Sequence, residues 1–112
     1  LVAELDGLWA LTQRTVSEAA KTGVPGVGGS LVKLQYSELV QRLGDVAFKL
    51  MDRSRLTLDE MWVDERLRVL ALPIAAGSSQ IQRNIIGERI LGLPKEPAND
   101  RTLPFKELPK NG

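Results

Sequence analysis

Apolar residues recur every three or four positions along most of the chain, which is the spacing that places them on one face of an α-helix. This periodicity predicts helices over residues 1–21, 31–51, 58–72 and 79–91. No strand pattern of useful length and no internal repeat are found in the sequence. Since the predicted helices have short links, we expect an all-α fold, an up-down helical bundle of about four helices.

Glycine and proline interrupt the periodicity between the first two predicted helices. The segment 23–29 is rich in both residue types and predicts a flexible link rather than a phosphate-binding loop, because it lacks the Lys-Ser/Thr pair and the preceding strand of a P-loop. Ser30 is a natural N-cap for the second helix. Gly44 lies in the middle of that helix, where a missing side chain allows a neighbouring element to approach closely.

Capping residues and prolines mark the later helices. Two pairs have the capping-box spacing, in which the side chains and free backbone amides of the first turn bond reciprocally. These pairs are Thr57 with Glu60 and Ser79 with Gln82. Pro73 is expected to end or kink the third helix, and Gly92 followed by Pro94 to end the fourth. We interpret residues 1–92 as a helical domain and the proline-rich residues 93–112 as an extended tail.

Composition excludes several kinds of chemistry. The 112 residues contain neither cysteine nor histidine, so disulfides, thiolate catalysis, Cys/His metal sites and imidazole-based triads are absent. The 15 basic and 14 acidic side chains nearly cancel, which gives no electrostatic case for binding nucleic acid. No apolar run is long enough for a membrane span, and residues 1–6 do not form a signal peptide. We expect a cytoplasmic protein without a metal site.

Residues 74–94 read IAAGSSQIQRNIIGERILGLP. This segment resembles the C-terminal signature of acyl-CoA dehydrogenases, which typically reads EGTS(E/Q)IQRNIIA followed by LGLP. About residues 1–95 are similar to the family's C-terminal helical domain without its first helix, so we expect a domain that is incomplete on its N-terminal side. The resemblance implies FAD-dependent α,β-dehydrogenation of an acyl-CoA, with an electron-transfer flavoprotein as the electron acceptor.

The resemblance also assigns expected roles to four residues. Ala76 occupies the family's usual catalytic base position and cannot accept a proton, so no catalytic residue is assigned. Its backbone N–H could still polarise the thioester, and Gly77 would let the substrate approach the backbone, so both are expected to bind substrate. Ser78 and Gln80 match positions that contact FAD in the family.

Two interpretations of Ala76 remain open. The base could lie on another helix, upstream of Leu1, or the chain could be the base-less partner in a mixed oligomer, as in similar actinobacterial enzymes acting on sterol side chains. The family's glycine-rich loop, which touches FAD of the neighbouring subunit, is replaced by residues 51–55 without glycine, so FAD contact across a dimer is absent or made differently. The resemblance implies a homo- or hetero-oligomer built through the helical domain. An acyl-CoA oxidase relative fits the same residues.

Simpler interpretations compete with these roles. Asp59, Glu60, Asp64 and Glu65 could supply a substitute base, but acids at a helix start are more often placed there by the helix dipole. Arg83 and Arg89 are expected to form ion pairs within the bundle. The alternative for the whole chain is a non-catalytic helical scaffold or partner subunit without flavin chemistry.

Overall fold

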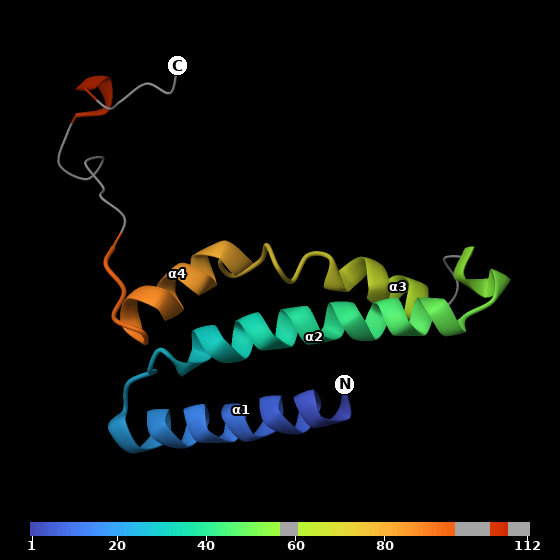
Figure 1. Cartoon of the computed structure of the whole chain (residues 1–112), viewed down its shortest axis with the longest axis horizontal. Helices are drawn as coiled ribbons and strands as arrows, with labels where there is room; N and C mark the ends of the chain where they lie inside the picture. Colours follow the sequence, from blue (N-terminus) through green and yellow to red (C-terminus); the bar gives the residue numbers. More distant parts are fainter. Residues whose placement is uncertain (57–60, 96–103, 108–112) are drawn as a thin grey trace.

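The computed structural model of the chain describes residues 1–56, 61–95 and 104–107. It confirms the all-α fold, since these residues form helices and no strand (Figure 1). The α-helices are α1 (Val2–Thr22), α2 (Gly28–Leu50), α3 (Met61–Val69) and α4 (Ser79–Arg89), and the short 3₁₀ helices are η1 (Arg53–Leu56) and η2 (Phe105–Glu107). No described helix is long and apolar enough to cross a lipid bilayer.

Helix α2 is the centre of the bundle. Figure 1 shows α1 on one side of α2 and, on the other side, α3 and α4 one after the other along its length. The chain direction reverses between α1 and α2 and again between α2 and α3, which is the expected up-down arrangement. The bundle is therefore an open layer in which α2 contacts every other α-helix.

The start of α2 differs from the prediction. The helix begins at Gly28, preceded by Val27 without a side-chain cap, so Ser30 lies inside the first turn and is not the N-cap. A Cβ atom on Gly28 would lie 2.6 Å from Oγ1 of Thr15 on α1. The absence of a side chain at Gly28 thus lets the extended first turn of α2 pack directly on α1. Gly23, with φ of +71°, ends α1 in the left-handed conformation expected of a glycine C-cap.

The end of α3 also differs from the prediction. The helix ends at Val69 and not at Leu72, because the next amides bond three residues back, from Leu70 to Leu67 and from Leu72 to Val69. Pro73 explains this tightening, since its ring disfavours helical geometry at the preceding residue. The predicted start of the helix at Leu58 and the Thr57–Glu60 capping box lie outside the described residues.

The tail is described only in part. Residues 93–95 have neither helix nor strand. Residues 105–107 instead form the 3₁₀ turn η2, closed by a bond of 2.8 Å from the Glu107 amide to the Pro104 carbonyl. Gly92 has the left-handed φ of +68° typical of a residue that follows a helix, but α4 ends at Arg89 with Ile90 as its C-cap, two residues earlier than predicted.

Few apolar side chains are buried in the part of the chain that the structure describes. They are Leu8 on α1, Leu39 on α2, and Val63 and Val69 on α3. Leu39 is only 1% exposed and is the largest completely enclosed side chain among the described residues. Because α1 and α3 lie on opposite sides of α2, these residues form two small cores on either side of the central helix.

Gly44 permits the close approach that its position in the middle of α2 predicts. A Cβ atom there would lie 2.8 Å from Cδ of Arg66, whose side chain crosses the helix at this point. The Arg66 guanidinium is anchored by Asp45, at 2.8 Å between Nη2 and Oδ1. The side chain therefore has little freedom to move aside.

We expect Gly44→Ala to lower the free energy of unfolding by about 1 kcal/mol, because the clash with Arg66 outweighs the helix propensity gained. Gly7→Ala is the matched control. It lies inside α1, and its Cβ would meet no atom closer than 4.0 Å. That change is expected to raise stability by about 0.5–1 kcal/mol. Urea unfolding of both variants measures whether the two changes in stability have opposite signs. A Gly44→Ala variant more stable than the wild type would contradict the packing argument.

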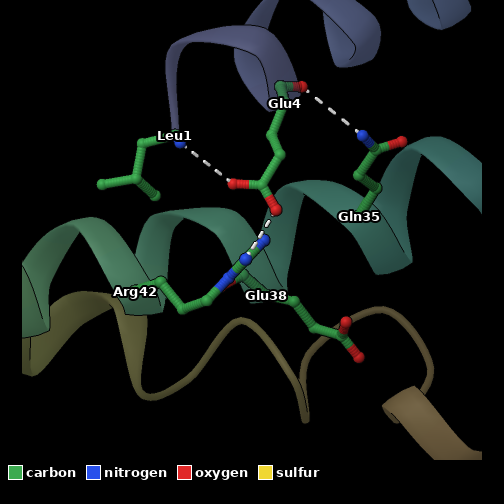
Figure 2. Close-up of polar contacts among 5 residues, drawn as sticks. All are labelled: Leu1, Glu4, Gln35, Glu38 and Arg42. Atoms are coloured by element: carbon green, nitrogen blue, oxygen red, sulfur yellow. Dashed lines mark hydrogen bonds and ion pairs between the residues drawn. The ribbon is translucent and has the colours of Figure 1, made fainter.

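Ion pairs join α2 to α1 and to α4 as well as to α3. Figure 2 shows Glu4 of α1 accepting a bond of 2.6 Å from Nη1 of Arg42. Glu38, one turn earlier on α2, points away from this pair and accepts a hydrogen bond from Arg83 of α4. The ion pair predicted for Arg83 is thus confirmed, whereas no described residue pairs with Arg89.

The Glu4 carboxylate gives a pH-dependent contribution to stability. The hydrogen bond from Arg42 lowers the pKa of Glu4 below its usual 4.5. A carboxyl group with a lowered pKa stabilises the fold at pH values above its pKa in the unfolded chain. This stabilisation is lost as the pH falls through its pKa in the folded protein. We expect the stability difference between the wild type and Glu4→Gln to shrink below pH 4.5 and in high salt. Asp6→Asn, at an acid with no ion pair among the described residues, should show no such loss in the same urea titrations.

Candidate functional site

The turn between α3 and α4 has an unusual backbone. Ala76 has φ of +53° and is the only non-glycine residue with positive φ among those described, and Gly77 follows with φ of +90°. Left-handed geometry costs alanine roughly 1–2 kcal/mol, so surrounding contacts must hold Ala76 there. Gly77 carries the larger φ at a position where glycine has no such cost.

Two side chains hold the carbonyl groups of this turn. Nζ of Lys33, on α2, donates a hydrogen bond of 2.6 Å to the carbonyl oxygen of Gly77. Nε2 of Gln82, on α4, donates one of 3.1 Å to the carbonyl oxygen of Ala76. Gln82 is only 7% exposed, so its amide is fixed by the packing around it. The turn is therefore tied both to the central helix and to the helix that follows it.

The cap of α4 lies one residue earlier than predicted. Ser78 is the N-cap, and its Oγ accepts a hydrogen bond from the Ile81 amide at 3.3 Å. Ser79 is the first helical residue, and its amide donates to the Pro73 carbonyl at 2.8 Å, which closes the turn. Its hydroxyl is buried without a partner, and the Gln82 side chain bonds to Ala76 rather than back to the cap. The left-handed turn places Ser78, not Ser79, where the side chain can reach the Ile81 amide.

The turn leaves three consecutive backbone amides unpaired. Within the described part of the chain, the N–H groups of Ala76, Gly77 and Ser78 donate no hydrogen bond. Ala76 is exposed, and Gly77 and Ser78 are half-buried, so a ligand can reach this segment. Adjacent free amides at a helix N-terminus can stabilise negative charge on an oxygen atom.

The four residues singled out from the sequence lie together. Ala76 and Gly77 form the turn, Ser78 is the N-cap of α4, and Gln80 lies in its first turn. The Ser78 hydroxyl uses its oxygen as an acceptor, which leaves its proton available for a ligand, and the Gln80 side chain is exposed and unpaired within the described structure. Both groups can donate hydrogen bonds to oxygen atoms of a ligand.

Sequence reasoning missed the role of Lys33. It lies 44 residues before Gly77, and nothing in the spacing of the helices indicates that its ammonium reaches the turn. Gln82 was noted for capping, but its actual partner is the Ala76 carbonyl. A long-range contact of this kind depends on how α2 and α4 pack, which the helical periodicity alone does not determine.

Most acids on the helices around the turn are neutralised by arginine. Glu38 pairs with Arg83, and Asp45 pairs with Arg66, whose side chain is only 23% exposed. Arg66 is therefore largely removed from solvent, although α3 is rich in charged residues. Asp64 pairs with Arg68 along α3 at 2.8 Å, whereas Asp59 and Glu60 lie outside the described residues. No group of three acids in the described structure could hold a metal ion.

Comparisons with known proteins agree with this architecture. Residues 1–91 match the family model described as "Acyl-CoA dehydrogenase, C-terminal domain". Two curated relatives, both named acyl-CoA dehydrogenase IpdE1, come from Mycolicibacterium smegmatis and Mycobacterium tuberculosis. They are 41% and 38% identical to this chain over 57% of its length. No solved structure gives a significant match.

The aligned region spans only 17% and 18% of these two relatives, so most of their length has no counterpart in the residues compared. The family model, in contrast, covers the whole helical layer from α1 to the end of α4. The turn described above falls inside that match. The chain therefore belongs to the acyl-CoA dehydrogenase family, whose C-terminal domain corresponds to residues 1–91.

Proposed function

We propose that this chain is the C-terminal helical part of an FAD-dependent enzyme that introduces an α,β double bond into an acyl-CoA thioester. The observation that carries this proposal is the turn at Ala76, Gly77 and Ser78, with three unpaired amides at the start of α4. Family membership and the names of the two relatives support the same activity.

The residues of the turn have distinct proposed roles. The Ala76 amide would donate to the thioester oxygen, where negative charge develops as the α-proton leaves. Gly77 presents no side chain, so the acyl group can pass close to the backbone. Ser78 and Gln80 would hold FAD through their free hydrogen-bonding groups, and FAD when bound would accept the β-hydrogen as hydride. An electron-transfer flavoprotein would then take up the electrons.

The proton-accepting group must come from outside this turn. Ala76 has no titratable atom, and the nearby Glu38 is held by Arg83. We propose that the base is supplied by another segment of the same protein or by a partner subunit.

The experiment that tests this function is the flavin content of the gene's full product, purified from the cytoplasm with any partner encoded beside it. Stoichiometric FAD, reduced on addition of acyl-CoA, supports an active site in this subunit. FAD at half occupancy in a mixed oligomer supports the role of a base-less partner. A protein without flavin overturns the proposed function.

A second function follows from what the turn lacks. Ala76 replaces the usual carboxylate, and the link after α2 contains no glycine. Both features suit a non-catalytic helical scaffold or partner subunit. In that case the wild type would bind no FAD, and the helices would serve only for assembly.

We also propose that the helical layer assembles with further subunits, as the same chain or a mixed oligomer. Trp9, Tyr36 and Trp62 are 64%, 47% and 45% exposed. Tyr36 belongs both to a groove of about 370 Å³ between α1 and α2, which Trp9 lines, and to one of about 290 Å³ between α2 and α3, which Trp62 lines. An exposed apolar surface of this kind is typical of a protein–protein interface.

Replacing Trp9 with glutamine is expected to raise the dissociation constant of the oligomer at least about tenfold, since buried aromatic anchors dominate interface energies. Light scattering at several protein concentrations measures the change. Val24→Gln is the control, because Val24 is equally exposed, at 65%, but lies in the link between α1 and α2. An unchanged mass in Trp9→Gln would place the interface elsewhere.

A further inference from the structure

The Lys33 side chain connects the central helix to the turn before α4. Its ammonium lies 2.6 Å from the carbonyl oxygen of Gly77, in a partly buried contact between residues 44 positions apart. None of the roles proposed above uses this lysine. The bond is shorter than most amide hydrogen bonds, as expected when the donor carries a charge.

The contact determines where the neighbouring amide points. In a trans peptide the C=O and N–H groups point in opposite directions, and the described chain contains no cis peptide. The Gly77 carbonyl shares its peptide group with the Ser78 amide. Since Lys33 holds the carbonyl on the side of α2, the Ser78 amide points away from α2.

Gln82 acts in the same way on the preceding peptide group. Its amide holds the Ala76 carbonyl at 3.1 Å, which directs the Gly77 amide away from Gln82. With both carbonyls held, the backbone of Ala76 stays at φ of +53° despite the steric cost for an alanine. The positive charge of Lys33 also polarises the peptide group that it contacts, so the Ser78 amide becomes a stronger donor.

We propose that Lys33 is a positioning residue, which holds the turn at Ala76 and Gly77 in the conformation that presents its free amides to a ligand oxygen. The inference rests on the proposed function for the identity of that oxygen, the thioester carbonyl, to which the Ala76 amide would donate. Lys33 and Gln82 orient the Ser78 and Gly77 amides directly, and they act on the Ala76 amide through the backbone of Ala76 that they hold. The geometry of the turn itself depends only on Lys33, Gln82 and the two carbonyls. Lys33 touches neither substrate nor cofactor in this role.

The test compares Lys33→Met with the wild type, using the gene's full product. The first readout is amide hydrogen exchange in peptides covering residues 73–82, where the Ser79 amide is protected by its bond to Pro73. We expect exchange there to be at least about tenfold faster in the variant, with exchange in α1 unchanged. Lys33→Arg should restore slow exchange, because its guanidinium still donates to the carbonyl.

Lys49→Met is the matched control. Lys49 is exposed in the last turn of α2 and makes no hydrogen bond within the described structure, so this variant should exchange as the wild type does. Where Lys33→Met does not fold, Lys33→Met combined with Ala76→Gly replaces it, since glycine adopts the positive φ without strain. That double variant should fold and still exchange faster in residues 73–82 than Ala76→Gly alone.

The second readout is turnover of acyl-CoA per bound flavin. We expect kcat in Lys33→Met to fall at least about tenfold while KM changes less than about twofold, because misplaced amides lose contact mainly with the charge that develops in the transition state. A fall in flavin content with kcat per flavin unchanged overturns the positioning role. Equal acceleration of exchange in every helix overturns it as well.

The two proposals fail in different ways. Unchanged exchange in residues 73–82 of Lys33→Met overturns the role of Lys33, whether or not the protein turns over acyl-CoA. A wild type that binds no flavin overturns the proposed function, and the exchange measurement then still decides whether Lys33 holds the turn.

Discussion

Replacing Leu39 with alanine is expected to lower the free energy of unfolding by about 3–4 kcal/mol. Leu39 is 1% exposed and lies in the middle of α2, the helix against which all the other α-helices pack. Truncation leaves a cavity, because the surrounding helices can move together only in part to fill it. Urea unfolding of the gene's full product, followed by circular dichroism, measures the loss.

Leu50→Ala is the control for this prediction. Leu50 ends the same helix and is 82% exposed, so its truncation should change stability by no more than about 0.5 kcal/mol. A Leu39→Ala variant as stable as Leu50→Ala would show that the centre of α2 is not the core of the fold.

The second large effect is expected at Gly77. Gly77→Ala places a Cβ atom 2.7 Å from Nε2 of Gln82 and imposes a side chain at φ of +90°. The strain and the loss of the Gln82–Ala76 hydrogen bond together should lower the free energy of unfolding by about 2–3 kcal/mol. The turn should also lose its fixed amides, so flavin content and acyl-CoA turnover should fall with it.

Gly23→Ala separates the backbone strain at positive φ from the loss of the Gln82–Ala76 hydrogen bond. Gly23 also has positive φ, of +71°, but a Cβ atom there would meet nothing within 4 Å. Only the backbone strain remains, so we expect a loss of about 1 kcal/mol with no change in flavin content. Equal losses of stability in the two variants would contradict the proposed packing of Gln82 against the turn.

Helical periodicity predicted the fold well because it reports which face of each helix is buried. The first helix, expected over residues 1–21, is found as Val2–Thr22, and the glycine that ends it has the expected left-handed conformation. The predicted boundaries are wrong at helix ends, because single contacts determine the residue at which a helix begins or ends. Gly28 packs against Thr15 and extends α2 past Ser30, and Pro73 tightens the chain as far back as Leu70.

The sequence indicated which residues form the candidate site, but not their backbone conformation or their long-range hydrogen bonds. The motif placed Ala76, Gly77, Ser78 and Gln80 on one turn because these residues are neighbours in the chain. It could not reveal the positive φ of Ala76 or the hydrogen bond from Lys33. Both arise from the packing of α4 on α2, which brings together segments that the sequence separates.

The central position of α2 also has a consequence for how the protein opens. Since the Leu8 side and the Val63–Val69 side lie on opposite sides of α2, we expect them to open as two separate cooperative units. Detachment of α1 would expose its own contacts while α3, α4 and the turn stay in place. Amide protection should therefore rise from α1 to α2 in a stepwise order, and α2 should be the last helix to lose its structure.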